Sequence, residues 1–433
     1  MANEEMEEDR IMSQRPPDVR ITDFDAPEFS PDVREMIEGV APLAAAIPWT
    51  LEAALEQASE RVGLDDFGED IFSEPLSVFM KGSREEGGLS PLGEVTIWGQ
   101  IGQFLDARLL VEDQWKRHPE IAEEEIDRPI IIVGLPRTGT THLHNLISAD
   151  PAIRYLSWWE SLEPVPPLSE QEGHFDVDPR WQRAAMGIEM RDKMMPLFKR
   201  MHDMWPDHAH EEVHLLAIAG STMLFEALVV SESWRDWYLS HDQTPWYAYM
   251  KRVLQVLQFR GGKGERWVLK SPQHLEQFTP LLRTFPDASF AVTHRDPLAI
   301  TASFATMSAY SSRLSRDPVD AVRVGQYWSD RIETMLGSCV RDRDLLPEDQ
   351  SVDVLFHEFM EDEMGMVERI YSLAGQPLTE DSRRAMQEFV DEHPRGMYGR
   401  VAYDLADFEI DAQERRANLA PYVERFGVKL EDF

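Results

Sequence analysis

The fold is constrained most by a short apolar run that leads directly into a glycine-rich loop. Ile130-Ile-Ile-Val133 is a continuous β-branched run between turn residues, which is typical of a strand buried on both faces of a sheet. The loop Gly134-Leu-Pro-Arg-Thr-Gly-Thr-Thr141 follows, and residues 142–147 are compatible with a helix. A Gly-x-x-x-x-Gly-x-Thr loop between a strand and a helix presents backbone N–H groups to an anion. The sequence therefore predicts an anion site at this end of the sheet.

Three further apolar runs predict strands, at residues 267–269, 289–292 and 352–356. Stretches with helical spacing separate these runs along the chain. Strands that alternate with helices indicate an α/β fold with a central, mainly parallel sheet.

We expect three regions along the chain. Residues 1–30 are acidic and contain several prolines, and we expect an extended arm there. Residues 31–127 have mostly helical spacing and form a helical N-terminal extension. Residues 128–433 form the α/β domain, in which residues 180–256 are a large helical insertion. This insertion would cover the C-terminal edge of the sheet, where ligands bind in open α/β folds.

The net charge of the chain excludes some classes of binding partner. The 79 acidic and 43 basic residues give a net charge of −36, which argues against binding to nucleic acid or to an anionic membrane surface. The most apolar run, from Leu215 to Val230, contains Glu226 and is too short for a membrane span, so it predicts one buried helix. A single cysteine, Cys339, and an acidic N-terminus without an export signal predict a cytoplasmic protein.

The loop departs from the nucleotide-binding P-loop at one position. A P-loop of ATPases and kinases carries Lys after its second glycine, whereas this chain has Thr140 there. The only cation of the loop is Arg137, three residues earlier. A P-loop kinase is therefore disfavoured and stays an alternative.

The segment Pro136-Arg-Thr-Gly-Thr-Thr141 resembles the 5′-phosphosulfate loop of the sulfotransferases that use 3′-phosphoadenosine 5′-phosphosulfate (PAPS), and it resembles the bacterial-type branch most. The family loop is commonly Pro-Lys-Ser-Gly-Thr-Thr, so Arg137 falls at its lysine. The resemblance implies a three-layer P-loop-like fold and an enzyme of the PAPS-dependent sulfotransferase class. It also implies that the donor is bound by Arg137, Thr138, Gly139, Thr140, Thr141 and His142.

Two further segments resemble the donor site of the same family. Arg295 follows the predicted strand at 289–292, and Ser303 lies eight positions later, which is the family's spacing for the pair that binds the 3′-phosphate. An arginine fork and a hydroxyl suit such a dianion. Near the C-terminus, Arg395-Gly396 resembles the loop that closes over the 3′-phosphate.

The strand at 267–269 ends in Lys270, and His274 follows four positions later. This segment resembles the family's strand-Lys-x-His segment, in which Lys steadies the bridging oxygen and His takes the proton of the acceptor. The resemblance implies catalytic roles for Lys270, His274 and Arg137. Some sulfotransferases use Glu as the base, so Glu211 and Glu212 are the alternatives to His274.

Residues His210-Glu-Glu-Val-His214 match the His-Glu-x-x-His pattern of zinc proteases. A helix running through 215–230 would place both histidines on one face. The extended protease pattern fails, because Gly220 stands at the position of its third histidine. Zinc proteolysis also leaves the glycine-rich loop and the Arg295/Ser303 spacing unexplained, so it ranks last.

The expected activity follows from the resemblance. It is in-line transfer of a sulfuryl group from PAPS to a hydroxyl of a small-molecule acceptor, with 3′,5′-adenosine bisphosphate (PAP) as the product and no metal required. The many Trp and Met residues between 158 and 246 favour an apolar or aromatic alcohol or phenol as acceptor. A catalytically silent anion-binding module is the remaining alternative, and the sequence indicates no oligomeric state.

Overall fold

The protein is described here from a computed structural model, which covers residues 16–262 and 264–431. A sheet of five parallel strands lies at its centre, in the order β3-β4-β2-β5-β6. The strands are β2 (Ile130–Val133), β3 (Ile153–Tyr155), β4 (Arg266–Ser271), β5 (Ser289–His294) and β6 (Ser351–Leu355). The predicted α/β class, the parallel sheet and all four predicted strands are confirmed. The sequence analysis missed β3, an edge strand of only three residues.

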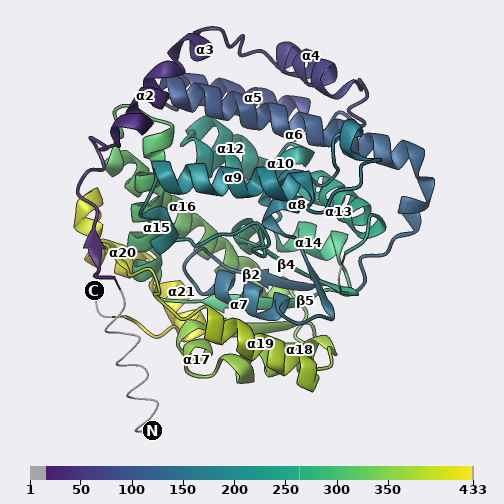
Figure 1. The fold of residues 1–433 in the computed structure, drawn as a ribbon. Coiled ribbons are helices and arrows are strands. Elements are labelled where there is room, and N and C mark those ends of the chain that lie inside the picture. The colour runs from purple at the N-terminus through teal and green to yellow at the C-terminus, as the bar shows by residue number, and fades with distance from the viewer. Residues whose placement is uncertain (1–15, 263, 432–433) are drawn as a thin grey trace.

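Helices cover both faces of the sheet and produce three layers (Figure 1). The flanking helices are α7 (Thr140–Ser148), α13 (Thr244–Phe259), α15 (Pro297–Ser311), α16 (Ala321–Asp342), α18 (Glu363–Ala374) and α19 (Glu380–Glu392). Ile130 and Ile132 pack into one core cluster with α7, α18 and α19. Ile131 and Val133 face the opposite core, which includes α13, α15 and α16. The side chains of β2 alternate between two cores, which explains its unbroken apolar run.

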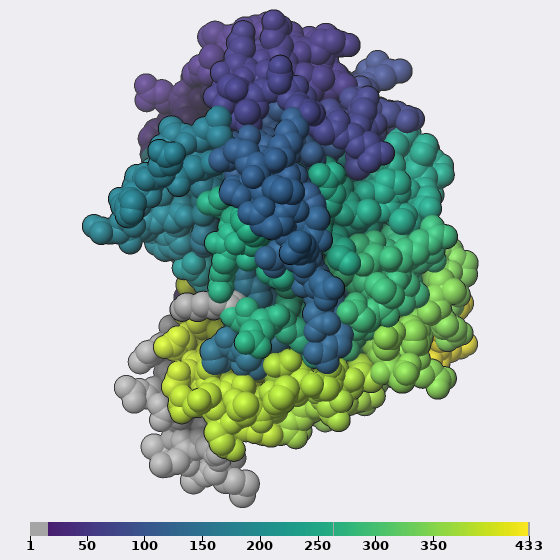
Figure 2. All heavy atoms as spheres, turned by 90° about the vertical axis from the view of Figure 1, so that its right-hand side faces the viewer, coloured from purple at the N-terminus to yellow at the C-terminus, as the bar shows by residue number. Residues whose placement is uncertain are grey.

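Within residues 16–129, five helices precede the sheet in sequence: α2 (Pro31–Gly39), α3 (Ala41–Ala45), α4 (Leu51–Val62), α5 (Ser73–Glu85) and α6 (Pro91–Arg117). The longest, α6, begins where the Ser90 hydroxyl accepts the Gly93 N–H and Pro91 takes the first helical position. Figure 2 shows that these N-terminal helices gather at one end of the molecule, opposite the segment that follows β6. Residues 1–15 of the expected arm lie outside the described residues. In its remainder, β1 (Val19–Arg20) pairs in parallel with β7 (Val401–Ala402).

The segment between β3 and β4 is mostly helical. It contains α8 (Trp158–Leu162), α9 (Pro179–Met194), α10 (Val213–Ala219), α11 (Leu224–Leu228), α12 (Glu232–Ser240) and α13. The prediction of one helix over 215–230 is wrong, because the chain turns at Gly220 with φ +112° and ends α10 there. A β-carbon at Gly220 would also come within 2.7 Å of Phe72. Both the positive φ and the lack of space for a side chain therefore favour glycine at this position.

The remaining elements are short. The helices are α14 (Phe278–Thr284), α17 (Phe356–Glu361), α20 (Ala412–Asn418) and α21 (Ala420–Phe426). The single 3-10 turns are Pro119–Glu123, Leu168–Glu170, Phe198–Arg200, Pro272–Glu276, Ser312–Leu314, Arg343–Leu345 and Leu405–Phe408. None of the helices in the described part of the chain is long and apolar enough to cross a membrane.

Candidate active site

The glycine-rich loop connects β2 to α7 and has the conformation of an anion cradle. Arg137 and Gly139 both have positive φ, +72° and +87°, which turns successive backbone N–H groups toward the same side. No described side chain caps the N-terminus of α7, which begins at Thr140. Its first N–H groups and the positive end of the helix dipole are therefore available to an anion.

The start of the loop is packed tightly against β5. A β-carbon on Gly134 would lie 1.9 Å from the hydroxyl oxygen of Thr293, a separation that no real side chain tolerates. The Thr138 hydroxyl donates to the Leu135 carbonyl at 2.7 Å and lies 2.6 Å from the Thr293 hydroxyl. Thr138 is buried, so its hydroxyl fastens the loop to the sheet instead of facing the cavity.

A cavity of about 360 Å³ opens above this loop. It brings together eight of the residues predicted to bind the donor, from three distant parts of the chain. These are Arg137, Gly139, Thr140, Thr141, His142, Arg295, Arg395 and Gly396. The wall that sequence reasoning missed comes mainly from the segment between α9 and α10 and from the end of α19. It contains Lys199, Arg200, Met201, His202, Trp205, His208, Phe389 and His393.

Two arginines of the cavity, Arg295 and Arg395, have carboxylate partners within the protein. Arg295 donates from Nε and one terminal nitrogen to the two oxygens of Glu431, at 2.6 and 2.7 Å. Its other terminal nitrogen donates to the backbone carbonyl of Arg137 at 2.7 Å. Burial opposes the charge on Arg295, but the ion pair with Glu431 outweighs it and raises the pKa of this guanidinium. Glu363 pairs with Arg395 and lies 3.1 Å from Nε2 of His142.

Arg137 links the loop to α15 and to the wall between α9 and α10. Its Nε donates to the Ser303 hydroxyl at 3.0 Å, and a terminal nitrogen donates to the carbonyl of Met201. Burial and the neighbouring charge of Arg295 lower the pKa of the Arg137 guanidinium. The two groups predicted to bind opposite ends of the donor, Arg137 and Ser303, are thus neighbours.

Lys270 and the pair Glu211-Glu212 form a buried group at the end of β4. The Lys270 ammonium, on a side chain only 1% exposed, pairs with the carboxylate of Glu211, which is 21% exposed. The neighbouring Glu212 accepts the backbone N–H of Lys270 on both oxygens, at 2.9 and 3.0 Å. Two adjacent carboxylates therefore hold the side chain and the backbone of the same lysine.

His274 lies behind this group, in the 3-10 turn Pro272–Glu276. Its side chain is fully buried, with Nε2 3.3 Å from Glu212 and Nδ1 2.8 Å from the Tyr247 hydroxyl. Like Lys270, Glu211 and Glu212, it is not among the residues that line the cavity. The structure thus brings the partly exposed Glu211 to Lys270, whereas the buried Glu212 lies between His274 and the Lys270 backbone.

The His-Glu-x-x-His segment does not form the expected zinc-protease helix. His210 precedes α10, and its backbone N–H donates to the Leu156 carbonyl at 2.7 Å. Its Nε2 lies 3.0 Å from Nδ1 of His214, and Glu211 turns to Lys270 instead. The expectation that one helix presents both histidines on one face is therefore wrong. Residues 16–262 and 264–431 contain no group of three or more His, Cys, Asp or Glu side chains that could hold a metal ion.

Five histidines of this region have little exposure to solvent: His144, His208, His210 and His214 are buried, and His202 is half-buried. Burial lowers the pKa of each, to about 3 for His208 and about 4 for His214. Four of them are crowded into residues 202–214, and this crowding was the sequence signal for the missed wall. Trp205 stacks on His393 with 5.1 Å between ring centroids. The segment between α9 and α10 therefore contacts the end of α19.

Comparison with known proteins agrees with this geometry. The model of the sulfotransferase family matches residues 129–381. Among solved structures, sulfotransferase STF1 from Mycobacterium tuberculosis is 29% identical, with a TM-score of 0.72 over 86% of this chain and 98% of that one. Sulfotransferase STF9 from Mycobacterium avium is 26% identical, with a TM-score of 0.78 over 89% of this chain and 98% of that one. No curated protein matches the chain.

A parallel sheet with a phosphate-type loop and a cationic cavity at its C-terminal edge defines a P-loop-like group-transfer protein. The family match covers more than half of the chain, and the chain belongs to the sulfotransferase family. Membership implies that its chemistry is the transfer of a sulfuryl group.

Proposed function

We propose that the protein transfers a sulfuryl group from PAPS to a hydroxyl of a small-molecule acceptor. The observation that carries this proposal is the convergence of two anion sites on one cavity. The cradle at the start of α7 suits a 5′-phosphosulfate, while Arg295 and Arg395 suit a second phosphate. A donor with phosphates at both ends of a nucleoside fits this arrangement better than ATP does.

The residues proposed to bind the donor form two groups, one for each end of the nucleotide. The backbone N–H groups of residues 138–142, with the hydroxyls of Thr140 and Thr141, would hold the 5′ end. Arg295, Ser303 and the Arg395-Gly396 loop would hold the 3′-phosphate. Arg137 lies between the two groups, next to Ser303, and would contact the bridging region.

The chemical step is in-line displacement at sulfur. The acceptor oxygen forms a bond to sulfur while the bond between sulfur and the bridging oxygen of PAPS breaks, and PAP leaves with that oxygen. Lys270 and Arg137 would stabilise the negative charge that develops on the leaving oxygen. This step needs position and charge more than covalent help, and these side chains supply both without a metal ion.

Glu211 is the base that the geometry favours. A base must reach the proton of the acceptor hydroxyl, and the Glu211 carboxylate is partly exposed beside Lys270. His274 is fully buried behind Glu212, and Glu212 itself is fully buried and occupied by the Lys270 backbone. In this assignment the proton of the acceptor passes to Glu211.

The acceptor we propose is an apolar or aromatic alcohol or phenol. Met201 and Trp205 give the wall between α9 and α10 an apolar surface next to the histidines that line the cavity. A flat or apolar acceptor would pack on that wall with its hydroxyl toward Glu211.

Donor recognition is tested by thermal unfolding in the presence of nucleotides. PAP should raise Tm, because a ligand at 100 times its Kd stabilises the folded state by about 2.7 kcal/mol. ADP lacks the 3′-phosphate and should raise Tm much less. Equal stabilisation by ADP, or none by PAP, contradicts the proposed donor.

Turnover is tested with labelled PAPS and a panel of phenols and aliphatic alcohols. Label in the acceptor supports sulfuryl transfer. PAP binding without turnover against the whole panel favours the silent anion-binding module, and phosphate transfer from ATP with magnesium favours the kinase.

A further inference from the structure

We propose that His274 is a positioning residue, which together with Tyr247 orients Glu212 and through it fixes Lys270 and Glu211. This inference rests on the proposed function for its kinetic consequence. Its structural part stands on a chain of buried hydrogen bonds that can be tested without turnover.

Glu212 is a carboxylate with no exposure to solvent. A buried carboxylate is tolerated only when donors satisfy its oxygens. The described donors are the backbone N–H of Lys270, at 2.9 and 3.0 Å from the two oxygens, and Nε2 of His274, at 3.3 Å. His274 therefore completes the shell of the group that anchors the end of β4.

The neighbours of His274 determine which of its two ring nitrogens carries the proton. The backbone N–H of Met223 donates to Oε1 of Gln273 at 2.9 Å, so the amide nitrogen of Gln273 points the other way and donates to the Tyr247 oxygen at 3.4 Å. The Tyr247 proton is then free to go to Nδ1 of His274, 2.8 Å away. With Nδ1 accepting, the neutral ring carries its proton on Nε2 and donates it to Glu212.

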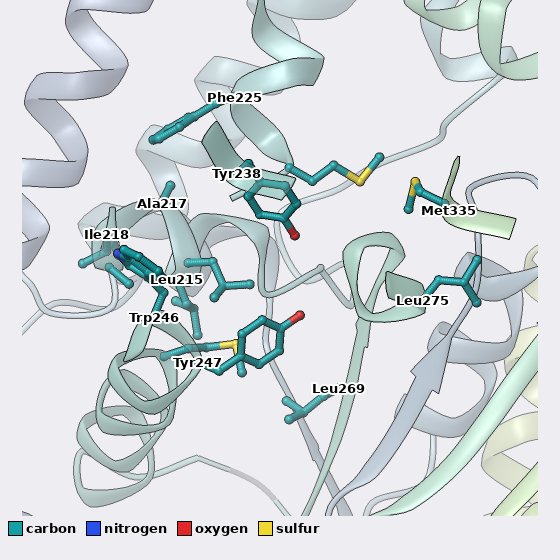
Figure 3. Close-up of a cluster of buried hydrophobic side chains, with 14 of the residues drawn as sticks. Leu215, Ala217, Ile218, Phe225, Tyr238, Trp246, Tyr247, Leu269, Leu275 and Met335 are labelled. Atoms are coloured by element: carbon teal, nitrogen blue, oxygen red, sulfur yellow. The ribbon is translucent and has the colours of Figure 1, made fainter. Parts of the chain in front are cut away.

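This chain of hydrogen bonds leaves neither ring nitrogen of His274 with a free lone pair. Nδ1 accepts from Tyr247, and Nε2 carries the hydrogen that Glu212 receives. Burial raises the pKa of the Tyr247 hydroxyl well above its usual value, which keeps its proton in place. Figure 3 shows Tyr247 inside a cluster of buried side chains that includes Leu215, Leu269 and Leu275. The His274 ring, enclosed in this way, can hold Glu212 in place but cannot reach an acceptor hydroxyl.

The effect on chemistry passes through two adjacent residues. Glu212 holds the backbone of Lys270, and Glu211, next in the chain, holds its ammonium. A shift of Glu212 would move the Glu211 carboxylate relative to the lysine. Positions at a reacting centre must be kept within fractions of an ångström, so such a shift lowers kcat while the donor cavity stays intact.

The decisive variant is His274→Gln. A glutamine amide can donate to Glu212 and accept from Tyr247, but it cannot take a proton from an acceptor. We expect kcat within about fivefold of wild type, whereas loss of a general base lowers the rate by about 10²- to 10⁴-fold. His274→Phe removes the donor to Glu212 and should lower kcat at least about tenfold, with the PAP-induced rise in Tm retained.

The fold offers a matched control. His294 is also buried between a tyrosine hydroxyl and a carboxylate, 3.0 Å from Tyr422 and 2.9 Å from Asp353. His294→Phe should lower Tm about as much as His274→Phe while kcat changes less than about twofold. Equal losses of kcat in both variants would overturn the positioning role, because general destabilisation would then explain the effect.

Two outcomes separate this inference from the proposed function. If wild type transfers sulfuryl groups and His274→Gln is inactive yet binds PAP, the positioning role is wrong and His274 is the base. If wild type shows no transfer, ¹⁵N NMR of labelled histidine still decides the structural part. A proton on Nε2 of His274 supports the chain, and a proton on Nδ1 overturns it. Tyr247→Phe should abolish the preference for Nε2.

Discussion

Glu431 binds the guanidinium of Arg295 with both carboxylate oxygens, at 2.6 and 2.7 Å. The backbone N–H of Glu431 donates to Asp296 at 2.7 Å, so the C-terminal segment is held beside the arginine proposed to bind the 3′-phosphate. The carboxylate uses the same guanidinium fork that a phosphate would use.

Glu431→Gln should therefore bind PAP more tightly than wild type, because the charged competitor for Arg295 is removed. We expect Kd to fall about three- to tenfold, which corresponds to about 0.7–1.4 kcal/mol. Isothermal titration calorimetry measures it. Glu424→Gln removes the same charge from an exposed position on α21 and should leave Kd unchanged. Weaker binding by the Glu431→Gln variant would instead mean that Glu431 prepares Arg295 for the phosphate.

Removal of the proposed base should affect turnover without affecting donor binding. Glu211→Gln keeps the shape of the side chain and a hydrogen-bonding group near Lys270, but it cannot accept a proton. We expect kcat to fall about 10²- to 10⁴-fold, measured with labelled PAPS, while the Tm increase caused by PAP stays the same. Activity within a few-fold of wild type would exclude Glu211 as the base.

The closeness of Gly134 to β5 predicts a severe effect of one added methyl group. Gly134→Ala would place Cβ 1.9 Å from the Thr293 hydroxyl, so the loop must move. We expect loss of PAP binding and a lower Tm. Gly99→Ala is the matched control, because nothing lies within 4 Å of a β-carbon at that position of α6. It should raise stability by about 0.5–1 kcal/mol through helix propensity. Undiminished PAP binding by the Gly134→Ala variant would show that the loop is not the donor site.

The buried histidines predict a loss of stability in mild acid. Their folded pKa values lie below the ordinary 6.5, at about 3 for His208 and about 4 for His214. As pH falls below about 6.5 the unfolded chain takes up protons that the folded protein does not. Each such histidine then lowers the free energy of unfolding by about 1.4 kcal/mol per pH unit, until the folded pKa is reached.

Urea denaturation at pH 7.5 and pH 5.5 measures this effect. His214→Gln should reduce the difference in the free energy of unfolding between the two pH values, whereas His118→Gln, at a half-buried position, should not. An unchanged difference in the His214→Gln variant would show that His214 does not contribute to the pH dependence.

Local patterns in the sequence were enough to predict the sheet and the glycine-rich loop between β2 and α7. The apolar run at 130–133 and the glycine spacing after it depend on neighbouring residues, and the structure shows both the strand and the helix start at Thr140. The placement of Arg295 and Arg395 on one cavity also agrees with the sequence expectation. The position of Arg295 follows from the rule that the ends of parallel strands meet at one edge, whereas Arg395 follows α19 and is not at a strand end.

Features set by distant contacts could not be predicted in the same way. The burial of His274 and the partial exposure of Glu211 depend on how the turn at 272–276 packs against Tyr247 and Glu212. The contact between Arg295 and Glu431 joins residues 136 positions apart, and no local pattern marks it. The break at Gly220 had a local signal, but the apolar run through 215–230 outweighed it in the prediction.

The chain has a net charge of −36, and carboxylates of the protein already occupy arginines of the cavity. A bound donor must therefore displace these carboxylates. Two cations of the cavity, Arg295 and Arg395, already have internal counterions. Donor binding is then an exchange, in which phosphate oxygens replace carboxylates that return to water. Affinity should depend less steeply on ionic strength than the number of phosphate contacts alone implies. The pairs that take part in this exchange are Arg295 with Glu431 and Arg395 with Glu363.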